Sequence, residues 1–138
     1  MKAHIAIGIA VTIAIGTLLQ ALANSVLPVA ASVTDPETMF RSLAISSGAI
    51  CFISVTAGSM VAKGRFLWAA IGLWGAAWIA ILYILARIAD PIEPTTMVQV
   101  ASNNWLGILA TLIASISGAF LGKLIYSYLT NSRSAVAS

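Results

Sequence analysis

The sequence predicts an all-α integral membrane protein, a single bundle of four transmembrane helices arranged as two hairpins. Sixty per cent of the residues are hydrophobic, only 8 per cent are charged, and the mean hydropathy is +1.01. A soluble globular domain carries about 25 per cent charged residues. The apolar residues also form long stretches of roughly 20 residues, enough for a helix to cross a hydrocarbon core of about 30 Å. The 138 residues leave room for one domain, with spans expected at about 3–23, 42–62, 66–86 and 105–128.

The first apolar stretch follows Lys2 and carries no ionisable side chain except His4. It resembles a secretory signal, because Ala21-Leu22-Ala23 forms an A-x-A cleavage pattern after a hydrophobic run. The apolar core of a signal is usually about 7 to 15 residues long, and this stretch is longer. We therefore expect it to be retained as the first transmembrane helix.

The connections between the spans contain helix-start signals. Thr34-Asp35-Pro36-Glu37 has the form of a capping box with proline at the first helical position, which predicts a helix that begins before the membrane. The second connection, Lys63-Gly64-Arg65, is short enough to predict an antiparallel hairpin of the second and third spans. Ser102-Asn103-Asn104 supplies candidate N-cap residues for the last span.

Each predicted span carries small residues at about four-residue spacing, which places them on one helical face. In a bilayer such a face lets two helix backbones approach closely, and it is a common association surface. The last span has the longest row, which predicts a smooth groove for another helix. The candidate helix-packing residues are Gly8, Gly16, Gly58, Gly72, Ala110, Ala114, Gly118 and Gly122.

Tryptophans in the third span fall at two depths. Trp68 lies near the short basic connection and fits an anchor at the membrane interface. Trp74 and Trp78 fall at mid-depth, where an interfacial belt does not explain them. They are predicted either to fill gaps in the bundle or to contact a partner or an apolar ligand.

The charge distribution predicts the orientation in the membrane. All four acidic residues lie in the first and third connections, whereas both termini and the second connection carry only basic residues. The positive-inside rule therefore predicts a multi-pass protein of the plasma (cell inner) membrane with both termini in the cytoplasm. Lys63, Arg65 and Lys123 then form a basic inner edge. Ordinary topology signals explain these cations, and contact with acidic lipid headgroups is the alternative.

The residue types exclude several classes of chemistry. A charge at the bilayer centre costs about 2.5 to 3.5 kcal/mol and usually marks a proton or ion path, and no Asp, Glu, Lys or Arg falls at mid-depth of a predicted span. No catalytic Ser/His/Asp or Cys/His set, phosphate-binding loop or pair of histidines for haem is present. The single Cys51 allows no internal disulfide. We expect no enzyme activity, no cofactor, no metal site and no nucleic-acid partner.

Three functional classes fit these observations. The first is an accessory or structural subunit of a larger membrane complex, in which the small-residue rows contact other membrane helices in a hetero-complex or a homo-oligomer. The alternative is a homo-oligomeric channel or transporter for a neutral or apolar solute. A third class comprises lipid- or stress-related membrane factors. The candidate pore-lining residues are Thr12, Gln20, Ser46, Ser47, Ser115 and Ser117.

Overall fold

The computed structural model describes residues 2–26, 36–63, 65–89 and 96–136. Within these ranges the chain forms five α-helices and no strand, which confirms the predicted all-helical class. The helices are α1 (Lys2–Val26), α2 (Pro36–Val61), α3 (Leu67–Ala89), α4 (Met97–Asn103) and α5 (Trp105–Val136). Four of them are long and apolar enough to cross a membrane, over Ala3–Ser25, Ala44–Val61, Leu67–Ile88 and Trp105–Ser132.

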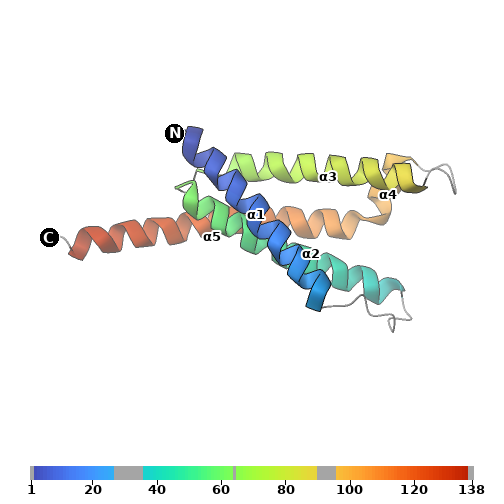
Figure 1. The fold of residues 1–138 in the computed structure, drawn as a ribbon, viewed down its shortest axis with the longest axis horizontal. Helices are drawn as coiled ribbons and strands as arrows, with labels where there is room; N and C mark the ends of the chain where they lie inside the picture. The colour runs from blue at the N-terminus through green and yellow to red at the C-terminus, as the bar shows by residue number, and fades with distance from the viewer. Residues whose placement is uncertain (1, 27–35, 64, 90–95, 137–138) are drawn as a thin grey trace.

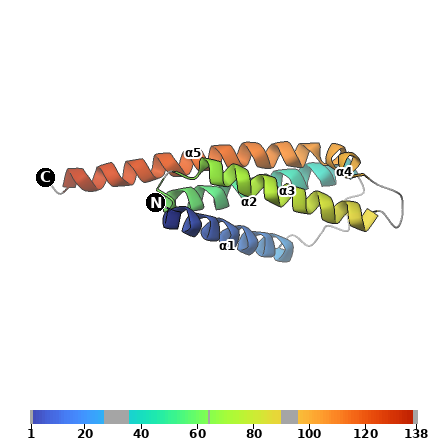
Figure 2. The same ribbon diagram turned by 90° about the horizontal axis from the view of Figure 1, so that it is seen from above.

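The long helices run alternately in opposite directions along one bundle (Figure 1). The start of α1, the turn between α2 and α3, and the C-terminal part of α5 therefore lie at the same end, here called the turn end. α2 makes its most extensive contacts with α5 and then with α1, and these two helices lie on opposite sides of it (Figure 2). α3 rests mainly on α5 and touches α1 over a short length. Which end faces the cytoplasm stays a prediction from the charges.

The most tightly packed apolar cluster lies at the turn end. Phe66, in the turn, is fully buried, and its ring lies beside the α1–α2 crossing at Gly8. Ala62 and Ala70, on either side of Phe66 in the sequence, belong to the same buried cluster. The helices therefore converge here, and α1 leans away from α3 toward the other end of the bundle (Figure 1).

The crossing of α1 and α2 depends on two glycines. A Cβ atom on Gly8 would lie 2.8 Å from the Gly58 carbonyl oxygen, and a Cβ atom on Gly58 would meet the Thr12 hydroxyl. Side-chain carbon atoms do not approach backbone oxygen atoms this closely, so both positions need glycine. The Thr12 hydroxyl donates to the Gly8 carbonyl oxygen at 2.9 Å, which satisfies it inside the contact.

The contact between α2 and α5 is equally close. A Cβ atom added to Gly118 would lie 2.7 Å from a backbone carbonyl oxygen of α2. A Cβ atom added to Gly122 would lie 2.5 Å from another carbonyl oxygen of α2. Ser59, which is fully buried, donates across this contact to the Ala119 carbonyl oxygen at 2.8 Å. Close backbone approach and a cross-helix hydrogen bond are both typical of contacts between membrane helices.

The third connection differs from the prediction. α3 extends to Ala89 rather than ending near residue 86, and a short helix, α4, precedes α5. Thr96 and Gln99 form the capping box that begins α4. The predicted N-cap segment is used only in part. Ser102 and Asn103 lie inside α4, whereas Asn104 directly precedes α5, and its backbone carbonyl oxygen accepts the Ile108 N–H at 3.0 Å. The Asn104 side chain instead donates to a carbonyl oxygen of α4 at 2.8 Å.

At the first connection, α2 begins at Pro36, the predicted first helical position. Thr34 and Asp35 of the predicted capping box lie outside the described residues. At the second connection, Lys63 adopts a left-handed backbone conformation with φ of 57°. This conformation lets the chain reverse between α2 and α3 within a few residues.

Aromatic side chains gather toward both ends of the long helices. Trp68, 83 per cent exposed, and the exposed Tyr128 lie toward the turn end, whereas the exposed Tyr83 and Trp105 lie toward the other. Trp105 and Tyr126 are 21 residues apart on one helix, which corresponds to roughly 30 Å of rise. That distance matches the thickness of a bilayer hydrocarbon core, and aromatic residues are enriched at both of its interfaces.

Candidate functional site

A cavity of about 640 Å³ lies between the four long helices, near the middle of their length. It remains open because α1 and α3 diverge from the turn end while α2 and α5 stay in contact. We call it the central cavity. Its lining comprises Thr12, Ile13, Gly16, Thr17 and Gln20 of α1; Ser47, Ile50, Cys51, Ser54 and Val55 of α2; Ala70, Leu73, Trp74, Ala77, Trp78 and Ile81 of α3; and Thr111 and Ser115 of α5.

Among the residues that the structure describes, the lining of the central cavity is mainly apolar and contains no Asp, Glu, Lys, Arg or His. Most of its hydroxyls are already satisfied by their own helix. Thr17 donates to the Ile13 carbonyl oxygen at 2.9 Å, and Ser54 to the Ile50 carbonyl oxygen at 2.6 Å. Such bonds to the preceding turn make a hydroxyl inexpensive in an apolar environment.

Ser47 is different. It lines the central cavity, is partly exposed, and makes no hydrogen bond with any residue in the described part of the chain. Its hydroxyl can therefore donate to or accept from a molecule inside the cavity.

Thr111 organises the tryptophan side of the cavity. Its hydroxyl oxygen accepts the indole N–H of Trp74 at 3.1 Å and that of Trp78 at 2.8 Å. The same hydroxyl donates to the Gly107 carbonyl oxygen at 2.7 Å. One donor and two acceptor positions are thus all used. The two tryptophans, predicted at mid-depth, line the cavity with their rings and tie α3 to α5.

A smaller cavity of about 170 Å³ adjoins the central cavity near α4. Ser47 and Trp78 line both, so the two cavities are neighbours. Asn103 and Asn104 line the smaller one and bring side-chain amides to this end of the bundle. The described residues thus place polar groups at the end of the central cavity opposite the turn.

Sequence reasoning found part of this lining. The predicted residues that line the central cavity are Thr12, Gln20, Ser47 and Ser115. Ser46 is not among the lining residues, and Ser117 lies on the exposed side of α5, where it donates to the Ile113 carbonyl oxygen. Cys51, Ser54 and Thr111 were missed. Helical spacing was the available signal, because Ser47, Cys51 and Ser54 share one face of α2, as Thr111 and Ser115 share one face of α5.

The candidate packing residues are placed in two ways. Contacts within the chain involve Gly8, Gly58, Gly118 and Gly122 at helix crossings, the buried Ala114, Ala110 beside Gly48, and Gly16 at the cavity. Gly72 on α3 is exposed, and a Cβ atom there would have nothing within 4 Å. Ala76 and Ala80, four and eight residues further on, are exposed as well. The small-residue row of α3 therefore faces away from the bundle.

The basic residues predicted at the inner edge lie near the turn end and are exposed. Lys63 and Arg65 line a third cavity there, together with His4 and Tyr126, whereas Lys123 does not. Within the described ranges, no three His, Cys, Asp or Glu side chains come together as a possible metal site.

The sequence matches no protein-family model, and comparison with curated proteins and with solved structures finds no significant match. The class of protein is therefore inferred from the helices and the cavity of this chain alone. The chain is a small all-helical protein with four helices of the length and apolarity found in multi-pass membrane proteins. These helices line a mainly apolar cavity that is open on one side.

Proposed function

We propose that this protein binds a neutral, mainly apolar solute in the central cavity and carries it within or across the plasma membrane. The observation that carries the proposal is the uncharged cavity of about 640 Å³, which is within the range of small-molecule sites. It lies inside one chain, so a homo-oligomer is not needed to create it. The proposal involves binding and movement only, with no covalent step.

The chemistry of the lining favours this class of solute. An ionised group in the cavity would lose its hydration without meeting an opposite charge, which is costly in a bilayer. Ile13, Leu73 and Ile81 offer apolar contacts, while Ser47 and the Gln20 amide offer uncharged polar groups. A molecule with an apolar body and one or two uncharged polar groups satisfies both.

Two features that predicted a protein partner have contacts inside the chain. The indole N–H groups of Trp74 and Trp78 are bonded to Thr111. Gly8, Gly58, Gly118 and Gly122 lie at crossings within the bundle. Both observations reduce the need for another subunit and favour the solute.

A cavity-filling variant tests the proposal. Ala77 lines the cavity and is exposed, whereas its neighbour Ala76 is exposed but does not line it. The protein is purified from its own host in mild detergent, and its organic extract is analysed by mass spectrometry. We expect a neutral compound in wild type and in the control Ala76→Phe, and its loss in Ala77→Phe. Equal retention in both variants, or no enriched compound in wild type, would count against the proposal.

The second candidate is an accessory or structural subunit of a larger membrane complex. The exposed small-residue row of α3, with Gly72 and Ala76, favours it, because such a row can receive a helix of another chain. Gly72→Leu is then expected to abolish copurification of a second polypeptide in fixed ratio. Gly118→Leu is unsuited to this test, since Gly118 lies against α2 and its substitution disturbs the chain itself.

A further inference from the structure

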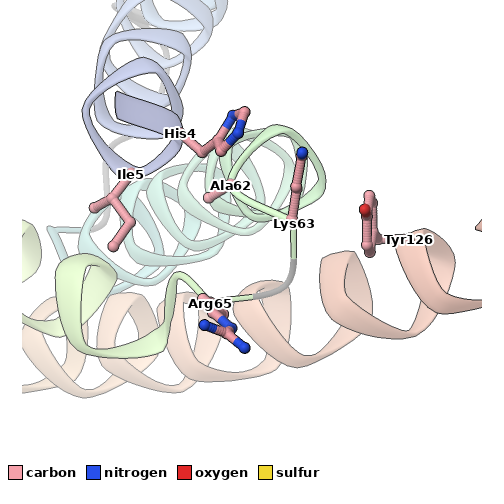
Figure 3. A pocket seen from close by; sticks show the side chains of 6 residues that line it. All are labelled: His4, Ile5, Ala62, Lys63, Arg65 and Tyr126. Atoms are coloured by element: carbon pink, nitrogen blue, oxygen red, sulfur yellow. The ribbon is translucent and has the colours of Figure 1, made fainter. Parts of the chain in front are cut away.

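A cavity of about 290 Å³ lies at the turn end of the bundle and shares no lining residue with the central cavity. Three segments meet there: the first turns of α1, the turn between α2 and α3, and α5. Its lining residues are His4, Ile5, Ala62, Lys63, Arg65 and Tyr126 (Figure 3).

The polar side chains that line this cavity can donate more hydrogen bonds than they can accept. In Figure 3 the His4 ring and the Lys63 side chain extend toward the same space, with the Tyr126 ring bordering it on the α5 side. The Arg65 side chain extends the opposite way from the turn. An ammonium group, a phenol and an imidazole can all donate to an anionic oxygen, and none of the described lining residues carries a carboxylate.

The backbone holds Lys63 in place. Its φ of 57° is uncommon for a residue with a side chain. The turn is fixed on both sides, because Lys63 donates its backbone N–H to the Met60 carbonyl oxygen at 3.2 Å and Arg65 donates to that of Ala62 at 3.3 Å. The backbone of Lys63 is therefore fixed by the turn, so its side chain starts from a defined place at the cavity.

We propose that this cavity binds the phosphate group of an anionic phospholipid, with Lys63 as the counter-charge and Tyr126 as a neutral donor. Charge-assisted bonds to phosphate are stronger than those between neutral groups. The surroundings favour a lipid over a soluble phosphate. Trp68, the second residue of α3, lies just beyond the turn, and its side chain is 83 per cent exposed. An exposed indole at this level offers a contact for lipid, which a soluble phosphate does not need.

The basic residues at this end can be explained by the positive-inside rule alone. That rule, however, does not account for a cavity at this place or for a tyrosine that lines it. Lys123 provides the matched control, because it carries the same charge on α5, is exposed, and does not line the cavity. General attraction to an anionic surface acts on Lys63 and Lys123 alike. A bound phosphate distinguishes them.

The test compares the full chain in nanodiscs of phosphatidylcholine with and without phosphatidylglycerol, with native mass spectrometry reporting the lipids that stay bound. Wild type is expected to retain phosphatidylglycerol selectively. Lys63→Gln is expected to weaken this retention about tenfold more than Lys123→Gln does, and Tyr126→Phe to weaken it about tenfold, the effect of one hydrogen bond to a charged group. Lys63→Arg, which keeps the charge, is expected to retain most of the binding.

Two results would overturn the proposal. The first is an equal effect of Lys63→Gln and Lys123→Gln with no effect of Tyr126→Phe, which corresponds to general surface attraction. The second comes from inorganic phosphate added to phosphatidylcholine discs. Binding of that ion with the same dependence on Lys63 and Tyr126, without selectivity for phosphatidylglycerol, would assign the site to a soluble phosphate. Neither outcome depends on the solute of the central cavity, because the variants lie outside its lining.

Discussion

Replacing Thr111 by valine tests whether the tryptophan side of the central cavity is held by one hydroxyl. Valine keeps the branched shape but removes the oxygen that accepts the indole N–H groups of Trp74 and Trp78. Both indoles would then lack a partner in an apolar region. Hydrogen bonds between helices in membranes contribute about 0.6 kcal/mol on average and up to about 1.7 kcal/mol. Two such bonds predict a loss of about 1 to 3 kcal/mol in the free energy of unfolding.

The loss is measured by titrating the detergent-solubilised protein with sodium dodecyl sulfate and following helicity and tryptophan fluorescence. Thr17→Val is the matched control, because the Thr17 hydroxyl bonds only to carbonyl oxygens of its own helix. A double-mutant cycle of Thr111→Val with Trp78→Phe isolates the bond of 2.8 Å. If Thr111→Val and Thr17→Val destabilise the protein equally, the inference that Thr111 ties α3 to α5 is wrong.

Two further predictions follow from the packing and the charges. Gly122→Ala places a Cβ atom 2.5 Å from a backbone oxygen and is expected to lower the free energy of unfolding by about 1 to 3 kcal/mol or more. Gly72→Ala places its Cβ atom in open space and is expected to be neutral or stabilising. The same unfolding titration measures both effects. Equal effects at the two glycines would contradict the packing of α2 on α5. A topology reporter fused after Val33 is expected to report the outer side and one fused after Arg133 the cytoplasm; the reverse result would refute the orientation inferred from the charges.

The helical class and the long apolar helices followed from the sequence because they depend on composition and length along the chain. An apolar stretch without charge, bounded by polar connections, has few alternatives to a membrane helix. The start of α2 at Pro36 followed from local backbone preference. The start of the short α4 also depends on local sequence, because Thr96 and Gln99 form its capping box. Our prediction missed this helix because it considered only the later Ser102-Asn103-Asn104 segment as the cap of the last span.

The tertiary structure alone decided which face of each helix turns inward. A helix of a soluble protein reveals its inner face because the opposite face is polar, but here the exposed faces are apolar as well, as expected of helices in a bilayer. On α3 the tryptophan face turns toward the cavity and the small face, with Gly72, turns outward, although either suits an interface. The bond between Trp78 and Thr111 joins residues 33 apart in the sequence. The central cavity likewise exists only because α1 diverges from α3. That divergence depends on the glycines near the turn end, which let α1, α2 and α5 pack closely there.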